Sequence, residues 1–307
     1  MHGIVLLATA AVCQYFGPLM KVFDMVPIAP PSADPVKTQM PLPSIPTIHQ
    51  FMWYASAPGC NDKRLDNWTC IACRLANKNA QHYMTLTNPS FNTRGVIALD
   101  HKARNIIVSF RGTRDAINVM SDVNFFPTHF KHAPVSGNLV HSGFLNAMES
   151  LSPQYIPALK RLRSSPHYQQ YKIVVTGHSL GGAMACLAAV KIKDVFQVPW
   201  SQMELLTYGQ PRTGNRAFAR WLDAQPLSSA RVVNYNDIVP HLMGAFVNDF
   251  VHQQNEVFID RVNEKRKLRI CNNKIFEDPK CSNKVPPSEY SVIAHVSYMN
   301  PGFINSC

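Results

Sequence analysis

The sequence lacks any apolar run of the roughly 20 residues that a helix needs to cross a bilayer, so no transmembrane span is expected. It also lacks internal repeats, which argues against a repeat architecture. Only 16% of the 307 residues are charged and 46% are hydrophobic, a balance typical of a compact folded protein. A chain of this length can form one large α/β domain with a substantial core.

Acidic residues are scarce, with 19 Asp and Glu against 30 Lys and Arg, which gives a net charge of +11. The first 50 residues contribute nothing to it, because Lys21 and Lys37 balance Asp24 and Asp34. The basic body has two interpretations, attraction to anionic lipid or cell-wall interfaces and simple solubility. No Lys/Arg block is interleaved with stacking aromatics, so no nucleic-acid partner is expected.

The N-terminus lacks the charged start of a secretion signal, apart from His2, but residues 4–12 form a short apolar run that ends among small residues. A buried apolar segment is the alternative interpretation. Seven prolines between residues 27 and 46 disfavour both helix and sheet. We therefore predict a signal peptide and Pro-rich pro-segment over residues 1–46, a catalytic domain over residues 47–307, and a secreted, extracellular protein.

The eight cysteines suggest a compartment that permits disulfides. Cys13 belongs to the leader, and Cys186 is predicted to be a buried free thiol on an apolar helix. The remaining six allow 15 pairings, and spacing alone cannot choose among them; they are Cys60, Cys70, Cys73, Cys271, Cys281 and Cys307. The CxxC pair lacks a second closely spaced Cys/His pair, so no metal is expected. Asn67 begins a glycosylation sequon.

Short β-rich runs alternate with helical patterns along the body, which predicts an α/β fold with a mostly parallel central sheet flanked by helices. The predicted strands are residues 95–99, 105–110, 172–176, 203–208, 231–235 and 256–260. The predicted helices are residues 144–162, after Gly182 to about Lys193, and near residues 215–222. In the first of these, Pro153 and Pro157 are expected to divide or restart the helix.

Residues 177–181, Gly-His-Ser-Leu-Gly, match the G-x-S-x-G nucleophile elbow, and they lie between a β run and a helix as that motif requires. The sharp turn projects the hydroxyl group of Ser179 above the sheet, and the helix behind it presents free amides that favour developing negative charge. An oxyanion site needs two amides, and the candidates are Leu180, which follows the serine, and Thr113, which follows Gly112 in an earlier loop after a strand.

A serine nucleophile needs a histidine base oriented by a carboxylate, in the chain order serine, acid, histidine. Asp237 directly follows a predicted strand and is the favoured acid. The other later acids divide into three predicted to be solvated and two left open; the solvated ones are Asp194, Asp223 and Asp278, and the open ones are Asp249 and Asp260.

Three histidines follow Asp237. His241 is only four residues away, too close to come from a separate loop. His295 is favoured as the base because of its position near the C-terminus. His252 remains the alternative, as a structural or pocket histidine that could be mistaken for the base.

The segment after Thr113 could form a short helix with two possible roles, a buried core helix or a lid that opens at a lipid surface. The sequence alone does not decide between them. The segment consists of Arg114, Asp115, Ala116, Ile117, Asn118, Val119, Met120, Ser121 and Asp122.

Seven motifs in one order resemble the class 3 lipase family of filamentous fungi, of the Rhizomucor and Rhizopus type, over roughly residues 50–307. They are WTCIAC at 68–73, VSFRGT at 108–113, VHSGFL at 140–145, VTGHSLGGA at 175–183, GQPRTGN at 209–215, NDIVPHL at 236–242 and HVSY at 295–298. The resemblance implies an α/β-hydrolase fold with a short helical lid over residues 114–122.

The resemblance also implies roles for individual residues. Ser179, Asp237 and His295 would form the catalytic triad, Thr113 and Leu180 the oxyanion hole, and His252 a structural histidine. The acyl groove would be lined by Phe125, Val292 and Ile293. The implied disulfides are Cys60–Cys307, Cys70–Cys73 and Cys271–Cys281.

The function implied is hydrolysis of acylglycerol esters, chiefly triacylglycerols, at a lipid–water interface. The alternatives within the family are mono- and diacylglycerol lipase, phospholipase A1 and feruloyl-type esterase. No cofactor is implied, contact with lipid would be peripheral, and a monomer is expected. Val119 stands where some members have a lid tryptophan, which leaves the acyl-chain preference open.

Overall fold

The computed structural model describes residues 40–112, 126–242, 249–262 and 265–298. Within these ranges, one sheet of eight strands has the order β1-β2-β3-β6-β7-β9-β11-β12. Its parallel strands are β3 (Asn105–Arg111), β6 (Lys172–His178), β7 (Met203–Tyr208), β9 (Ser228–Asn234) and β11 (Glu256–Val262). Antiparallel strands complete both edges, namely β1 (Gln81–Asn88), β2 (Thr93–Asp100) and β12 (Lys265–Ile270).

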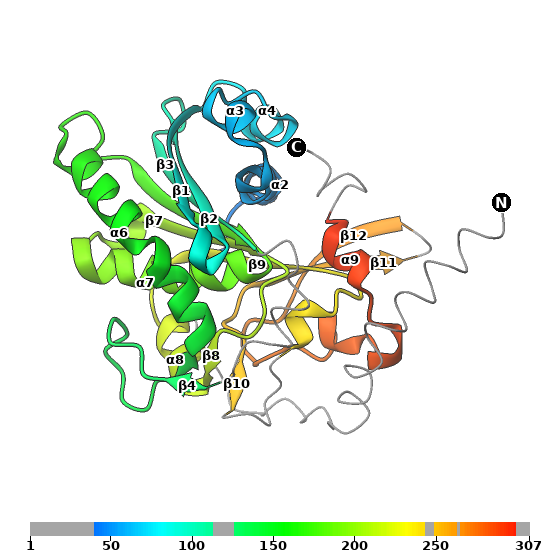
Figure 1. Ribbon diagram of the computed structural model, residues 1–307. Coiled ribbons are helices and arrows are strands. Elements are labelled where there is room, and N and C mark those ends of the chain that lie inside the picture. The colour runs from blue at the N-terminus through cyan, green and yellow to red at the C-terminus, as the bar shows by residue number, and fades with distance from the viewer. Residues whose placement is uncertain (1–39, 113–125, 243–248, 263–264, 299–307) are drawn as a thin grey trace, which may run out of the picture.

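Helices cover both faces of this sheet, as Figure 1 shows. On one face lie α6 (Ser142–Ser164), α7 (Leu180–Phe196) and α8 (Arg216–Asp223), and on the other lie α2 (Ile45–Ser56), α3 (Asp62–Asp66) and α4 (Ile71–Asn77). Two large apolar cores result, one on each face. None of the described helices is both long and apolar enough to span a membrane. The predicted α/β class with helices flanking a mostly parallel sheet is confirmed.

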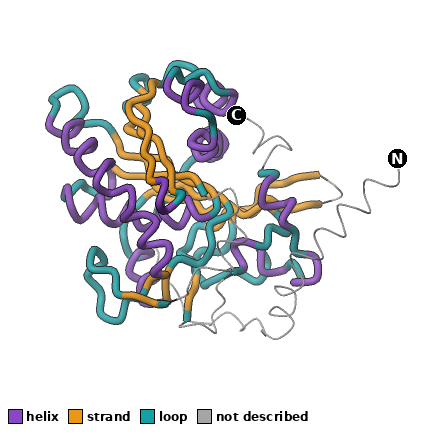
Figure 2. Tube along the Cα trace, viewed as in Figure 1, coloured by secondary structure: helices purple, strands orange, loops and turns teal. Residues whose placement is uncertain are grey.

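Shorter elements connect this framework, and Figure 2 shows the loops between them. A small sheet has the order β10-β8-β5-β4. Its strands are β4 (Pro127–Thr128), β5 (Val140–His141), β8 (Gly214–Asn215) and β10 (Phe250–Val251), and a final helix is α9 (Val292–Val296). The 3-10 helices are η1 (Ala57–Gly59), η2 (Pro89–Phe91), η3 (Trp200–Gln202), η4 (Val239–His241), η5 (Ser282–Lys284) and η6 (Pro287–Glu289).

The prediction that Pro153 and Pro157 divide the long helix is wrong. α6 runs without interruption through Pro153 and Pro157. A proline inside a helix costs about 3 kcal/mol because it removes a donor and crowds the preceding turn. Here one face of the helix is buried along its whole length, including Phe144, Leu151 and Leu159. Burial of each such side chain contributes about 1.5 to 3 kcal/mol, so the packed face outweighs the local cost.

The packed body begins before the predicted domain boundary at residue 47. Helix α2 starts at Ile45, and the side chain of Ser44 accepts a hydrogen bond from the amide of Thr47 at its N-terminus. Further upstream, the carbonyl of Met40 accepts a hydrogen bond from Asn255 at 2.9 Å, and that of Pro41 accepts one from the amide of Ser229 at 3.0 Å. Residues 1–39, where the signal and most of the pro-segment were predicted, lie outside the described residues.

Two of the three acids predicted to be solvated are buried. Asp223 ends α8 and is fully buried, and its carboxylate accepts the amide of Gln254 at 2.8 Å. Asp278 is 9% exposed and accepts the amides of Asn272 and Lys280. Position at a helix end or in a loop suggested solvent, but other loops cover both sites. Asp194 remains half-exposed beside His132.

Burial raises the pKa of Asp223 to about 8, well above its ordinary 3.8. The carboxyl group of Asp223 therefore stays protonated in the folded protein over a pH range in which it is ionised in the unfolded chain. The stability that the group contributes is complete below about pH 4 and falls as the pH rises to about 8, by at most about 1.4 kcal/mol per pH unit. Asp223→Asn cannot ionise and keeps an acceptor for Gln254. We expect its stability relative to wild type to grow between about pH 5 and 8 and then level off.

Chemical denaturation across this pH range measures the effect, and Asp62→Asn is the matched control. Asp62 is 76% exposed and pairs with Arg94. Its variant should show no such growth above about pH 5. A constant difference between Asp223→Asn and wild type would mean that Asp223 is already ionised in the folded protein.

Candidate active site

The turn between β6 and α7 places Ser179 in a backbone conformation that is rare for non-glycine residues, with φ of 60°. α7 begins directly after it, at Leu180, three residues earlier than the predicted start after Gly182. The flanking glycines explain the motif. A Cβ on Gly177 would overlap the carbonyl of Gly181, and a Cβ on Gly181 would overlap the carbonyl of Phe110. Only glycine at these places lets the neighbouring elements approach the turn.

Asp237 and His295 meet at the carboxyl edge of the sheet. Asp237 lies just beyond β9, and His295 lies in α9. Nδ1 of His295 is 3.0 Å from both carboxylate oxygens of Asp237, and the two residues are 2% and 0% exposed. Nε2 of His295 and Oγ of Ser179 are both buried, and neither has a hydrogen-bond partner among the described residues. Both atoms are therefore free to interact with a ligand.

Electrostatics keep Asp237 ionised. Burial alone would raise the pKa of Asp237, but the charge of His295 and the hydrogen bonds that the carboxylate accepts lower it below its ordinary value. The donors include the hydroxyl of Tyr298 at 2.5 Å and the amide of Val239 at 2.9 Å. An ionised carboxylate holds Nδ1 of His295 protonated and leaves Nε2 as the acceptor. The arrangement fits a general base.

Two further residues position the imidazole. The ring of His178 stacks on that of His295, with centroids 4.4 Å apart, and Nε2 of His178 donates to the carbonyl of His295 at 2.8 Å. Burial lowers the pKa of His178 to about 3, with a further contribution from His295, so it stays neutral. Gly209 has φ of 57°, and a Cβ there would lie 2.8 Å from Cε1 of His295. Both residues belong to motifs found in the sequence, but spacing alone gave no signal for these roles.

The remaining candidates for acid and base have other partners. Asp249 pairs with Arg216 at 2.9 Å, and Asp260 is buried between Lys284 at 2.7 Å and Arg269 at 3.1 Å. His252 is 4% exposed and donates from Nε2 to the carbonyl of Pro240 at 2.7 Å. Burial lowers the pKa of His252 well below its ordinary value. A buried neutral histidine tied to a loop carbonyl fits the structural role expected for it.

A buried ion pair holds the loop that follows Asp237. The guanidinium of Arg212 makes two contacts of 2.6 Å with Glu277 and donates to the carbonyl of His241 at 2.8 Å, at the end of η4. Glu277 also accepts the amide of His252 at 3.2 Å. Three loops on the catalytic side of the sheet are thereby joined, and a fixed loop keeps the carboxylate of Asp237 in place.

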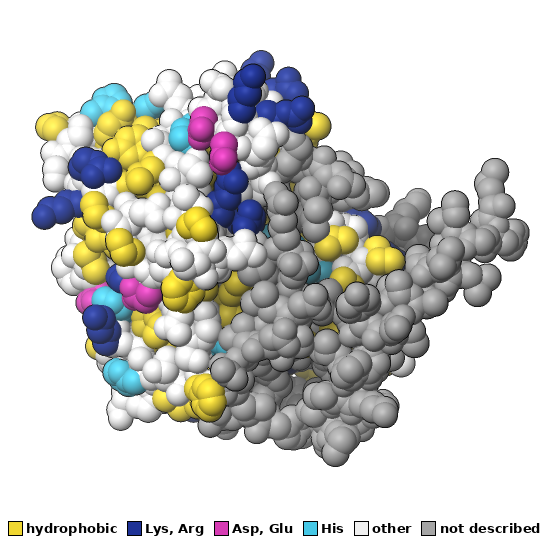
Figure 3. Space-filling model, in the orientation of Figure 1, with side chains coloured by type: hydrophobic (Ala, Val, Ile, Leu, Met, Phe, Trp, Pro, Cys, Tyr) yellow, Lys and Arg dark blue, Asp and Glu magenta, His cyan; other side chains and the backbone are white. Residues whose placement is uncertain are grey.

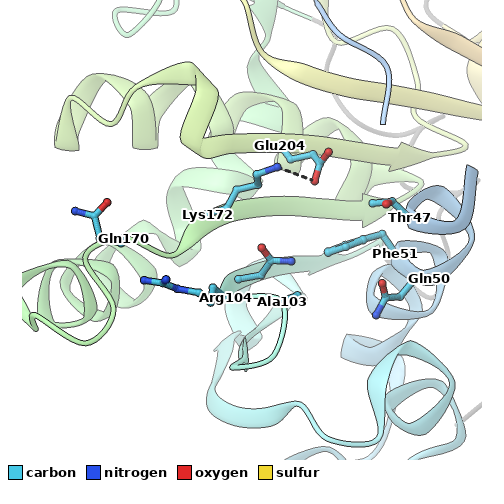
Figure 4. A pocket seen from close by; sticks show the side chains of 9 residues that line it. Thr47, Gln50, Phe51, Ala103, Arg104, Gln170, Lys172 and Glu204 are labelled. Carbon is cyan, nitrogen blue, oxygen red and sulfur yellow. Dashed lines mark ion pairs between the residues drawn. The ribbon is translucent and has the colours of Figure 1, made fainter. Parts of the chain in front are cut away.

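A hollow lies at the amino ends of the parallel strands, away from the catalytic residues, and is a separate feature. Figure 4 shows side chains from α2 and from the amino ends of β3, β6 and β7 around it, including Gln50, Arg104 and Gln170. A dashed line marks the ion pair between Lys172 and Glu204, at 3.9 Å. This lining is largely polar, and parallel strands place it at the end away from Ser179, so we do not assign the ester site there.

The family profile described as "Lipase (class 3)" matches residues 107–247. The lipase of Rhizomucor miehei is 34% identical over 235 residues, which cover 75% of this chain and 61% of that protein. The solved structure of Rhizomucor miehei triacylglyceride lipase has a TM-score of 0.75 at 30% identity, over 86% of this chain and 97% of that one. The chain belongs to the class 3 lipase family. The fold is the α/β-hydrolase fold of that family.

A further solved structure is that of a triacylglycerol lipase whose catalytic centre is formed by a serine protease triad. It is 31% identical, with a TM-score of 0.74, over 85% of this chain and 96% of that one. The chain spans about three-fifths of the length of the Rhizomucor relative compared as a full sequence.

Several site residues expected of a class 3 lipase lie outside the described residues. They are Thr113, the lid residues 114–122 and Phe125. The end of β3 before them does reach the elbow, because a Cβ on Gly112 would lie 3.0 Å from Cβ of Ser179 and 3.5 Å from the amide of Leu180. The predicted acyl-groove residues Val292 and Ile293 lie on α9 beside His295; Val292 is partly exposed and Ile293 is 75% exposed.

Two disulfides form at the expected positions, Cys70–Cys73 and Cys271–Cys281. The expected Cys60–Cys307 pairing involves Cys307, which lies outside the described residues. Cys186 is a buried free thiol, as predicted. Within the described ranges, one trio of potential metal ligands lies together, Glu256 with Cys271 and Cys281. Its two sulfurs are joined to each other, so it offers no thiolate.

Tyr298→Phe should lower kcat about 10-fold with little change in KM. The hydroxyl of Tyr298 donates to Asp237 and accepts the amide of Asn234 at 3.2 Å, and a hydrogen bond to a charged group is worth about 1.5 to 3 kcal/mol. Tyr155→Phe is the matched control, since its buried hydroxyl donates to the sulfur of Met148 and, among the described residues, to no carboxylate. Steady-state kinetics on a short-chain ester measures both. Equal kcat values for the two variants would reduce Tyr298 to a packing residue.

Proposed function

We propose that this chain is a serine lipase that hydrolyses the carboxylic esters of acylglycerols, chiefly triacylglycerols, at a lipid–water interface. The observation that carries the proposal is the buried Asp237–His295 pair, with its free Nε2 at the same edge of the sheet as the strained Ser179. Membership of the class 3 lipase family supports it, as does similarity to a triacylglycerol lipase with a serine protease triad.

In the first step of this mechanism, Oγ of Ser179 attacks the ester carbonyl while Nε2 of His295 takes its proton. Asp237 stabilises the imidazolium that forms. The amides of Leu180 and Thr113 are proposed to donate to the oxyanion of the tetrahedral intermediate. Collapse of this intermediate breaks the ester bond, and His295 returns the proton to the leaving alcohol. The acyl group remains on Ser179.

In the second step, water attacks the acyl-enzyme, and His295 acts again as general base. The second tetrahedral intermediate expels Oγ of Ser179, which recovers its proton from the imidazolium. A carboxylic acid leaves, and the free enzyme is restored. The histidine must therefore begin each half-reaction neutral and unprotonated at Nε2, which the ionised Asp237 favours by holding the proton at Nδ1.

A fluorophosphonate probe tests the nucleophile. The probe should label the wild-type protein, and labelling should be absent from Ser179→Ala. Ser142→Ala serves as the control for a serine elsewhere in the chain, at the start of α6, and should label as wild type does. Equal labelling of the Ser179→Ala and wild-type proteins would sink the assignment.

Substrate preference is tested by comparing emulsified triolein, micellar monoolein and a water-soluble short-chain ester. Triacylglycerol lipase activity predicts the highest rate on the emulsion. Preference for monoolein would point to a mono- or diacylglycerol lipase. A phospholipid and a feruloyl ester, added to the same series, test the other two activities implied by the resemblance. We further propose that the protein is secreted and monomeric; the two disulfides among the described residues support an oxidising destination.

A further inference from the structure

The hairpin formed by β11 and β12 brings cationic side chains to the catalytic edge of the sheet. β11 runs parallel to β9, so its carboxyl end lies at the edge where Asp237 follows β9. β12 then leads back from that edge. Three exposed cations on these strands define what we call the cationic hairpin surface: Arg261, Arg266 and Lys267. Arg261 and Arg266 share one face of the hairpin, and Lys267 lies on the other.

None of these three cations has an ion pair with a described carboxylate. Arg261 lies over the ring of Tyr235, 5.0 Å from its centroid, and Arg266 donates to the carbonyl of Ser297 at 3.1 Å. Asp260, the acid opposite Lys267 in the strand register, is already held by Lys284 and Arg269. Glu256, at the start of β11, is buried in an ion pair with Arg231 at 2.7 Å. The third acid of the hairpin, Glu264, is outside the described residues. Among the described residues, no carboxylate pairs with these three side chains, which favours an anionic partner.

The pairing of the two arginines adds a second argument. Arg261 and Arg266 are directly opposite each other across the two strands. Like charges in this position destabilise a sheet. The pKa of Arg266 is lowered, mainly because the side chain is partly buried and further because Arg261 carries the same charge. Charged side chains on β12 alone would protect an edge strand from pairing with another chain. That explanation does not require a second arginine on β11.

The surface is connected to the catalytic loops. Tyr235, under Arg261, is two residues before Asp237. Ser297, which accepts from Arg266, ends the helix that carries His295 and the 75% exposed Ile293. Cationic side chains and an exposed apolar one on connected elements form a combination that binds the boundary of an anionic bilayer, where headgroups meet acyl chains.

We propose that the cationic hairpin surface docks the enzyme onto lipid surfaces that contain anionic phospholipids. Docking there places the α9 side of the active site against the lipid. The inference rests on the proposed function only in one respect, namely that the lipid to which the enzyme docks contains its substrate. Binding itself needs no hydrolysis, so it is measured on Ser179→Ala protein, and its failure is distinguishable from a failure of the catalytic proposal.

The test compares binding to phosphatidylcholine vesicles with and without about 30% phosphatidylglycerol. The protein should prefer the anionic vesicles, and added salt should weaken the preference. Each cation near such a surface contributes roughly a 5-fold gain in binding, so the triple variant Arg261→Gln, Arg266→Gln, Lys267→Gln should lose about 100-fold. The double variant Arg261→Lys, Arg266→Lys should stay within a few-fold of the parent, since it keeps the charge.

A matched control removes three cations from the other edge of the molecule. Figure 3 shows Lys and Arg side chains gathered over α3 and α4, and α3 packs beside β1, at the edge opposite β12. The control variant is Lys63→Gln, Arg74→Gln, Lys78→Gln, all at exposed positions. It should keep most of the binding. An equal loss in both triple variants would assign the effect to net charge and overturn the proposal.

The single variant Lys267→Gln covers the case in which the triple variant does not fold, because Lys267 is exposed on the edge strand. It should bind anionic vesicles roughly 5-fold more weakly than the parent. No loss in this variant, no preference for phosphatidylglycerol, or retention on an anionic polysaccharide without vesicle binding would each contradict the proposal.

Discussion

His295→Ala is expected to abolish ester hydrolysis, with kcat falling by about 10⁴- to 10⁶-fold. The substitution removes the only group positioned to take the proton of Ser179 in the proposed mechanism, and a serine hydroxyl without a base is a weak nucleophile. It also leaves the buried carboxylate of Asp237 without the Nδ1–H donor of His295, so folding must be checked by circular dichroism. Rates on a short-chain ester, per mole of folded protein, measure the loss.

His252→Ala is the comparison that gives this result its meaning. Its imidazole is as buried as that of His295, and its removal leaves the carbonyl of Pro240 without a partner. That costs about 1 to 3 kcal/mol of stability, but most of the activity per folded molecule should remain. If His252→Ala lost the activity and His295→Ala kept it, the assignment of the base would be reversed.

Asp237→Asn should lower kcat by about 10⁴-fold while preserving the fold. Tyr298 and Val239 now donate to different oxygens of the carboxylate, Oδ2 and Oδ1. The one oxygen of an Asn can take only one of these two places, so its NH2 group takes the other and turns a donor toward Nδ1 of His295, which lies 3.0 Å from both. The proton of the imidazole then moves to Nε2, which can no longer accept one from Ser179. The binding step is untouched, so KM should change little.

Asp249→Asn provides the same substitution at an acid that the sequence also left open. Its carboxylate pairs with Arg216 on the surface rather than with a histidine. An exposed pair of this kind is worth at most about 1 kcal/mol, and kcat should stay near that of the wild type. If Asp249→Asn lost most of its kcat and Asp237→Asn remained active, the catalytic acid would be Asp249 and not Asp237.

The parts of the site that could be predicted are those with a local cause. Ser179 was evident because its turn requires glycines two residues away on either side, and those glycines stand in the sequence. Asp237 was evident because a residue just beyond a parallel strand reaches the ligand edge. His295 was favoured over His252 only by chain order, and the resemblance to class 3 lipases completed the choice.

What could not be predicted depends on contacts between distant segments. The hydroxyl of Tyr298 reaches Asp237 across 61 positions of the chain, and no spacing rule predicts that contact. The burial of Asp223 follows from a loop that arrives from beyond β10, and the continuity of α6 through Pro153 follows from the core it covers. In each case tertiary packing outweighs what the neighbouring residues favour.

The attachment of Met40 and Pro41 to the body limits where the predicted removal of the pro-segment can cut. Cleavage after residue 46 would deprive the buried Ser229 amide of its acceptor and the Asn255 side chain of two of its three acceptors, and it would remove the Ser44 cap of α2. Each lost acceptor costs about 1 to 3 kcal/mol and the cap about 1 kcal/mol, a large share of the stability of an ordinary domain. N-terminal sequencing of the processed protein should therefore find its first residue at or before Met40.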